Sequence, residues 1–188
     1  MFDSKFTFEL HLRSVSKLIS QKLGLLRKSV KVFGDQSILR KCFNSFILPS
    51  FEYCSPVWSS AADSHLKLLD RNLNGCKFLI PGLDTNLWHR RSVSCLCMLF
   101  KIYHNPEHPL HPELPALFQP LRFTRAAANS HCHSFMRVRC NTVQYSRSFI
   151  PAFTRYWNDL PEDVVECLGL QSFKTGANKF LMGRGARA

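Results

Sequence analysis

The run from Ile38 to Trp58, ILRKCFNSFILPSFEYCSPVW, constrains the fold more than any other part of the chain. Its apolar residues recur at steps of three and four, which is the period of a helix face turned toward a core. They are Ile38/Leu39, Cys42/Phe43, Phe46/Ile47, Phe51, Cys54 and Val57/Trp58. Pro49 lies inside the pattern without shifting its phase. Because proline removes one amide donor and clashes with the preceding turn, the pattern predicts one kinked helix over residues 36 to 58.

Similar periodicity elsewhere predicts a mainly α-helical fold, a small helical bundle followed by an irregular, Arg-rich C-terminal region that ends in short helices. The first ten residues are expected to be extended, because Phe6, Phe8 and Leu10 alternate with polar residues. The further predicted helices cover residues 9–26, 63–80, 87–104, 149–160 and 171–182. Asp35 and Asp63 are the predicted N-caps of the helices that follow them.

The most proline-rich stretch is residues 105–120, NPEHPLHPELPALFQP, which holds five of the ten prolines. Such a composition favours an extended connector with at most a single helical turn. It is also the best candidate for a domain boundary. Residues 121–146 lack clear periodicity, so no secondary structure is predicted for them.

Length and composition limit the class of protein. The chain has 188 residues, 45% of them hydrophobic and 16 of them Phe, which is enough to fill a core. It has no apolar run of 18 residues and no signal-peptide pattern, so we expect a soluble intracellular protein, cytoplasmic or nuclear, that is not secreted and has no membrane partner. Without an export signal, the eight Cys are expected to be reduced and mostly buried thiols, four of them on predicted apolar helix faces: Cys42, Cys54, Cys76 and Cys97.

The net charge of +12 is concentrated at the two ends of the chain. Residues 1–45 carry nine Lys/Arg and three acids, residues 46–120 six and six, and residues 121–188 ten and four. Every charged residue between 121 and 158 is arginine, whose planar guanidinium matches phosphate oxygens two at a time. These blocks favour a polyanionic partner, although a solvated basic surface is the alternative.

Catalytic and metal-binding motifs are scarce. The sequence has no Gly-rich phosphate loop and no paired carboxylates suited to two metal ions. Its one acidic cluster follows Leu160 and Pro161, where a short helix begins, so compensation of the helix dipole explains it best. That cluster comprises Asp159, Glu162, Asp163 and Glu166.

Two Cys/His groups can be arranged on paper as zinc ligands. They are Cys95, Cys97, His104 and His108, and His131, Cys132, His133 and Cys140. Neither group has the CxxC spacing typical of zinc sites. The prediction is therefore no metal, no cofactor and no small-molecule substrate.

Four blocks of the chain together resemble one protein family. They are FTFELHLRSVSKLISQKLGLLRKS, SILRKCFNSFILPSFEYCSPVWSSAADSHLKLLDR, HRRSVSCLCMLFKIYHNPEHPL, and YSRSFIPAFTRYWNDLPEDVV with LQSFK. In this order they resemble the C-terminal part of reverse transcriptases, RNA-directed DNA polymerases, from LINE-type, jockey-like non-LTR retrotransposons. The resemblance covers essentially the whole chain, and LPSFEYCSPVW and RSFIPAFTRYWNDLP are its most specific blocks.

The resemblance implies a division into four parts. Residues 1–12 would be a remnant of the exit from the polymerase palm, 13–104 the helical thumb, 105–120 the connector, and 121–188 a basic post-polymerase region. The family's aromatic-Ala-Asp-Asp hairpin, which holds the catalytic Mg²⁺ ions, has no match here, and neither does its endonuclease. We therefore expect the chain to be a non-catalytic fragment that has no enzymatic activity in isolation.

A thumb holds the primer-template duplex by its backbone, so the resemblance implies basic side chains that face phosphates. The candidate nucleic-acid-binding residues are Arg13, Lys17, Arg27, Lys28, Lys31, Arg40, Lys41, Arg137, Arg139 and Arg147. The expected partners are the backbone of RNA or DNA and the missing palm domain. Two alternatives stay open: a helical protein-interaction module, and a genomic relic with no selected function.

Overall fold

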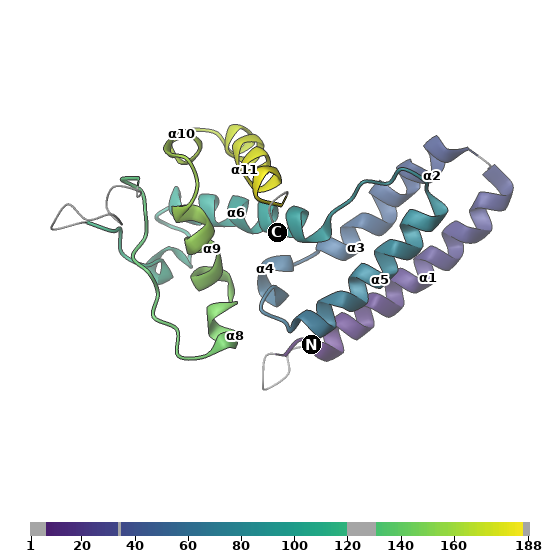
Figure 1. The fold of residues 1–188 in the computed structure, drawn as a ribbon, viewed down its shortest axis with the longest axis horizontal. Helices are drawn as coiled ribbons and strands as arrows, with labels where there is room; N and C mark the ends of the chain where they lie inside the picture. The colour runs from purple at the N-terminus through teal and green to yellow at the C-terminus, as the bar shows by residue number, and fades with distance from the viewer. Residues whose placement is uncertain (1–6, 34, 120–130, 186–188) are drawn as a thin grey trace. The chain divides into compact units, whose positions relative to one another are not determined.

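The computed structural model describes residues 7–33, 35–119 and 131–185, and most of them lie in helices (Figure 1). This confirms the predicted mainly α-helical fold. Within the described ranges the only β-type pairing is an isolated antiparallel bridge between Leu117 and Phe135. None of the helices in this part of the chain is both long and apolar enough to cross a membrane. The chain divides into two compact units, residues 1–87 and 88–188.

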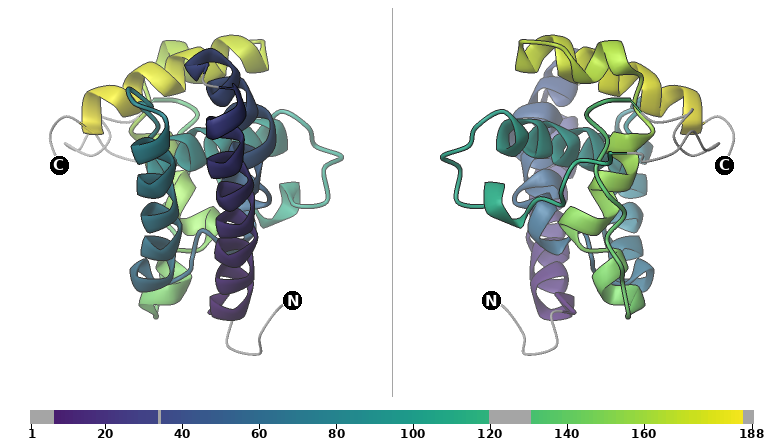
Figure 2. Two further views of the ribbon diagram at one scale, coloured as in Figure 1. Left: turned by 90° about the vertical axis from the view of Figure 1, so that its right-hand side faces the viewer. Right: turned by 90° about the vertical axis from the view of Figure 1, so that its left-hand side faces the viewer.

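The first unit is built on two long helices and a bent third one. Its elements are α1 (Glu9–Phe33), α2 (Gln36–Cys42), the π-helix η1 (Phe43–Ile47), α3 (Leu48–Glu52), α4 (Ser55–Trp58) and α5 (Asp63–Leu79). Helices α1 and α5 lie side by side (Figure 2). They run parallel, since His65 of α5 lies near Glu9 and Asn72 donates to Ser16 one to two turns farther on.

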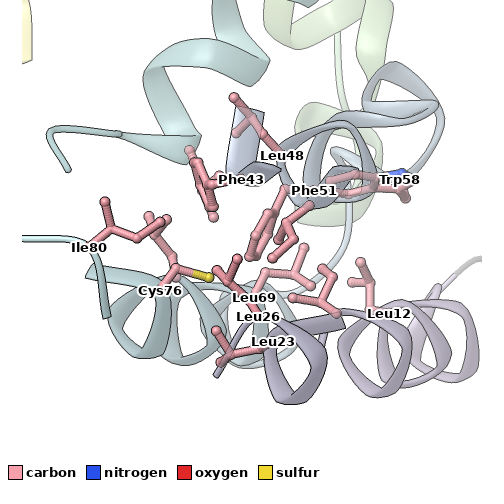
Figure 3. Packing of buried hydrophobic residues seen from close by; sticks show 14 of the residues in the cluster. Leu12, Leu23, Leu26, Phe43, Leu48, Phe51, Trp58, Leu69, Cys76 and Ile80 are labelled. Carbon is pink, nitrogen blue, oxygen red and sulfur yellow. The ribbon is translucent and has the colours of Figure 1, made fainter. Parts of the chain in front are cut away.

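A single apolar core joins these helices. Leucines of α1 and α5 are buried against the aromatic residues of η1 and α3, and Phe43 and Phe51 point toward the two long helices in Figure 3. The largest fully buried side chains of this unit are Trp58, Phe43, Phe51, Leu12, Ile19, Leu39, Ile47, Leu69, Ile80 and Leu87. Because one side of α1 is buried in this core, the helix is held in place and its opposite side faces solvent.

The bend at Pro49 is a π-turn. The amide of Leu48 donates to the carbonyl oxygen of Phe43, five residues earlier, and Pro49 follows where no amide donor is needed. In a regular α-helix each step of four residues overshoots a full turn by about 40°. The wider π-turn takes up this drift, so that Leu39, Phe43, Ile47 and Phe51 all remain buried.

The predicted helix over residues 36–58 is wrong at its C-terminal end. Tyr53 leaves helical geometry with ψ 126°, and Cys54 takes a positive φ of 53°. The corner is closed by the indole N–H of Trp58, which donates to the carbonyl oxygen of Tyr53 at 2.9 Å. Helix α4 therefore begins separately, and the predicted apolar face is only half buried. Its exposed members are Ile38, Cys42, Phe46, Cys54 and Val57.

Helix ends follow the sequence signals in part. The carboxylate of Asp35 accepts from the amide of Ser37 at 2.8 Å, as predicted for an N-cap. Asp63 lies inside the first turn of α5, whose N-cap is Ala62, so its prediction as a cap is off by one residue. Helix α1 continues to Phe33, past the predicted end at Leu26. Of the predicted extended start, Phe6 lies outside the described residues and Leu10 is already helical.

The second unit packs three helices around aromatic side chains. Its elements are α6 (Leu87–Tyr103), the single 3-10 turn η2 (His111–Glu113), α8 (Val143–Ser146), α9 (Phe149–Asn158), α10 (Glu162–Val165) and α11 (Leu170–Gly185). Phe100 of α6 stacks on Phe173 of α11 with ring centroids 4.4 Å apart. The ring centroid of Trp157 of α9 lies 5.6 Å from that of Phe173.

The division between the units does not coincide with the predicted boundary at residues 105–120. Helix α6 precedes that stretch, yet its Val93, Leu96 and Phe100 are buried in the core of the second unit. The prediction of an extended connector is wrong for most of this stretch: residues 105–114 form successive turns that include the single 3-10 turn, only residues 115–119 are extended, and all of them belong to the second unit. There the amide of Phe118 donates to the carbonyl oxygen of Ser134 at 2.7 Å.

Candidate nucleic-acid interface

One face of α1 carries four exposed cationic side chains. With about 100° of rotation per residue in an α-helix, residues 13, 17, 27 and 28 fall within an arc of about 100°. The buried residues of α1 lie on a separate arc whose centre is about 120° away. The four cations are Arg13, Lys17, Arg27 and Lys28, and we call this set the α1 basic face. The buried residues are Leu12, Ile19, Leu23 and Leu26.

The α1 basic face is poorly neutralised. Glu9 is the only acid among residues 9–33, and it pairs with Arg13 at 2.6 Å on the surface. The exposed fraction of the Arg13 side chain is 66%, and an ion pair so exposed contributes little to stability. Lys17, Arg27 and Lys28 form no ion pair with a carboxylate of the described residues. A phosphate can therefore approach this face without displacing a strong internal partner.

Lys22 lies outside the α1 basic face, and the fold gives it a different role. In the sequence pattern it breaks the apolar face of the first helix. In the structure its ammonium donates to the carbonyl oxygen of Phe46 at 2.9 Å and to the hydroxyl of Ser50 at 2.6 Å. It also lies 4.4 Å above the ring of Phe46. Lys22 thus ties α1 to the π-turn, a role that periodicity alone could not indicate.

An open groove lies beside this lysine. It has a volume of about 420 Å³ and separates α1 from α2 and η1. Leu25 and Phe46 in its walls are 57% and 54% exposed. The lining residues are Lys22, Leu25, Leu26, Ser29, Lys41, Cys42, Ser45, Phe46 and Ile47. The groove is mainly apolar, so it suits a protein or an aromatic group better than a phosphate.

The other predicted contact residues of the first unit have different surroundings. Arg40 donates from Nη2 to the carbonyl oxygen of Pro81 at 2.7 Å, so it holds α2 against the end of α5. Lys41 is exposed and lines the groove. Lys31 belongs to α1, but its side chain lies outside the described residues.

The arginines of the second unit that are predicted to contact nucleic acid are exposed, and they lie on irregular backbone or at a helix end. Arg137 and Arg139 belong to the extended segment before α8, and Arg147 is the C-cap of that helix. Of the remaining arginines between 121 and 158, Arg155 donates to the carbonyl oxygens of Ser146 and Pro151 and so has a structural role. Arg122 and Arg125 lie outside the described residues.

The cysteines are all free, but the prediction that most are buried is wrong. Cys42, Cys54 and Cys132 are exposed, whereas Cys76 and Cys95 are buried. Burial raises the pKa of the Cys76 thiol to about 11 despite the opposing charge of Arg27. Cys42 lies at the end of α2 beside the buried Phe43, and Cys54 lies at the corner where the chain leaves helical geometry.

Neither of the two Cys/His groups considered in the sequence assembles in the structure as a set of four ligands. Among the residues that the structure describes, one group of three potential ligands comes together, and it consists of Cys132, His133 and Glu166. Comparisons of the chain with protein-family models, with curated proteins and with solved structures gave no match. The functional assignment consequently rests on the residues and their geometry.

Proposed function

We propose that this chain is a non-catalytic C-terminal part of a retrotransposon reverse transcriptase, comprising its thumb and post-polymerase region. In this proposal it binds a primer-template duplex or element RNA through the phosphate backbone. The observation that carries the proposal is the α1 basic face, four exposed cations on one side of a rigid helix. The family resemblance of the sequence supports the same role.

The length of the α1 basic face suits a duplex. From residue 13 to residue 28 the helix rises about 22 Å at about 1.5 Å per residue. Double-stranded nucleic acid carries about one negative charge per 1.7 Å of its axis, so roughly a dozen phosphate charges lie within that span. Contacts of this kind position a protein on a duplex without selecting a sequence.

Packing of α1 supports the proposal further. A cationic helix binds a backbone best when its side chains are carried by a rigid element, because less order must then be imposed on binding. Leu12, Ile19 and Leu23 anchor α1 in the core, and Lys22 fixes it to the π-turn. The exposed cations are therefore held in a constant register along the helix.

The test measures binding of a labelled RNA–DNA hybrid duplex to the whole chain. Binding is monitored by fluorescence anisotropy at several salt concentrations. With four phosphate contacts, a slope of about −0.9 per contact predicts that affinity falls about 100-fold between about 50 and 200 mM salt. Binding that does not change with salt, or no binding, would contradict the proposal. Primer extension by the same preparation is expected to be absent, and its detection would refute the non-catalytic assignment.

The groove beside Lys22 supports the alternative of a protein-interaction module. Exposed apolar side chains such as Leu25 and Phe46 are typical of surfaces that pack against another protein. The palm of such a polymerase is the partner that this alternative suggests. Association through the groove would depend little on salt and would be lost in the variant Phe46→Ser, which leaves the α1 basic face intact.

A further inference from the structure

Three potential metal ligands converge at the edge of the second unit's core. Cys132 and His133 come from the irregular segment before α8, and Glu166 is the C-cap of α10. One ligand atom from each, a thiol sulfur, an imidazole nitrogen and a carboxylate oxygen, lies within 4.8 Å of the other two. Cys132 and Glu166 are exposed and His133 is half-buried, so an ion can reach the group from solvent.

The segment that carries Cys132 and His133 is held firmly on α9. The indole N–H of Trp157, a fully buried side chain, donates to the carbonyl oxygen of His133 at 3.0 Å. Asn158 accepts from the amide of Phe135 and donates to its carbonyl oxygen, both at 2.8 Å. The backbone at and after His133 is thus fixed before any ion binds, which is the condition for a selective site.

Helix α10 supplies carboxylates on the matching side. Glu162 and Glu166 are four residues apart, so their side chains lie on the same face of this short helix. One oxygen of Glu166 lies 3.6 Å from Nε2 of His133. The carboxylate of Glu162 reaches the backbone amide of Cys132 at 3.5 Å. Glu162 therefore stands beside the thiol as a candidate fourth ligand.

The imidazole of His133 is oriented from its other side. The hydroxyl of Tyr103 lies 2.8 Å from Nδ1, which leaves Nε2 directed at Glu166. A hydrogen bond to the second ring nitrogen is the usual support of a metal-binding histidine, because it fixes both the tautomer and the ring orientation. Tyr103 itself is packed against Phe135 and Trp157, so this support is rigid.

We propose that Cys132, His133 and Glu166, with Glu162 as fourth ligand, bind one Zn²⁺ ion that joins the 131–135 segment to α10. Thiolate, imidazole and carboxylate are the three ligand types of protein zinc sites, whereas Mg²⁺ and Ca²⁺ prefer oxygen alone. In a tetrahedral site with bonds of about 2.0 to 2.3 Å, two ligand atoms lie about 3.3 to 3.6 Å apart. The observed 3.6 Å between Nε2 of His133 and the Glu166 carboxylate lies at the upper end of this range, and the sulfur of Cys132, within 4.8 Å of both, would reach it by a small side-chain movement.

The sequence could not reveal this group. Its spacing suggests Cys132 and His133 together with His131 and Cys140. In the structure His131 instead pairs through Nε2 with the carbonyl oxygen of Trp157 at 3.1 Å, and the thiol of Cys140 bonds to the carbonyl oxygen of Val138. The carboxylates that complete the group are 30 or more residues away in the sequence. There the sequence explains them by compensation of the helix dipole, without reference to a metal.

The test is a titration of the whole reduced chain with Zn²⁺ in competition with a chromophoric chelator, with metal content measured after dialysis. We expect one Zn²⁺ per chain, and Co²⁺ in its place should give the intense thiolate-to-cobalt absorption. Cys132→Ser and Glu166→Gln should each weaken binding at least about tenfold and Cys132→Ser should abolish the cobalt band. Cys140→Ser, in the same segment, is the matched control and should bind as the parent chain does.

A fourth variant separates loss of the site from a general effect on folding. Tyr103→Phe keeps the ring in the core but removes the hydroxyl that orients His133, so it should weaken Zn²⁺ binding about 10- to 100-fold with stoichiometry unchanged. Circular dichroism should show all four variants to be as helical as the parent chain. Absence of Zn²⁺ binding by the parent chain would overturn the proposal, as would affinity and cobalt absorption that survive in Cys132→Ser.

Discussion

Removal of the α1 basic face is the sharpest test of the proposal that this chain binds nucleic acid. The variant is Arg13→Gln, Lys17→Gln, Arg27→Gln and Lys28→Gln combined. All four side chains are exposed and none contributes to the core, so the fold should tolerate the change. The single ion pair lost, between Arg13 and Glu9, lies on the surface and is worth less than about 1 kcal/mol.

The expected loss follows from counterion release. Each phosphate contact contributes about 0.9 to the slope of log K against log salt concentration, so four contacts contribute about 3.6. At about 0.1 M salt, each contact then accounts for about 0.9 of a decade in affinity, and the variant should bind about 10³- to 10⁴-fold more weakly. Smaller losses would mean that only some of the four side chains reach phosphates.

The assay is anisotropy of a labelled RNA–DNA hybrid at four or more salt concentrations, with a control of equal charge. The control variant replaces four exposed lysines outside the α1 basic face by Gln. These lysines are Lys67, Lys101, Lys174 and Lys179. For the control, the slope of log K against log salt concentration should differ from that of the parent chain by no more than about 0.9, the value of one phosphate contact. If both variants lose the same slope, overall charge and not the α1 basic face drives binding, and the reasoning is refuted.

Further predictions concern stability and thiol chemistry. Gly24→Ala should raise the free energy of unfolding by about 0.5–1 kcal/mol in urea titrations, because no side chain lies within 4 Å and alanine favours the helix. Gly176→Ala should lower it by about 1–3 kcal/mol, because the new methyl would lie 2.8 Å from a valine of α10. Arg40→Ala should cost about 0.5–1.5 kcal/mol and leave the salt slope unchanged, since its guanidinium bonds to a backbone carbonyl. In native protein a thiol reagent should modify Cys54 rapidly, and modify Cys76, with its pKa of about 11, only after unfolding.

Helix positions were largely predictable because they depend on local spacing. The periods of three and four marked α5, α6, α9 and α11 to within a few residues, and Asp35 marked the start of α2. Charge segregation along the chain likewise indicated that the first helix is cationic. What periodicity could not give was the geometry at Pro49. The π-turn before Pro49 keeps the buried residues on one side of the chain, and the positive φ of Cys54 accompanies a corner that the buried Trp58 closes, and neither follows from the local spacing of apolar residues.

Sequence by itself determined where the longer helices lie and that α1 is basic, since both follow from residue type and from spacing along one element. Tertiary structure alone decided which unit receives α6, which cations remain available for phosphate, and which carboxylates meet Cys132 and His133. Lys22 and Arg40 are as basic as Lys17, yet both are engaged with backbone carbonyls of distant segments. Such partners become neighbours only when the core closes, because burial of apolar area brings together residues that are far apart in the chain.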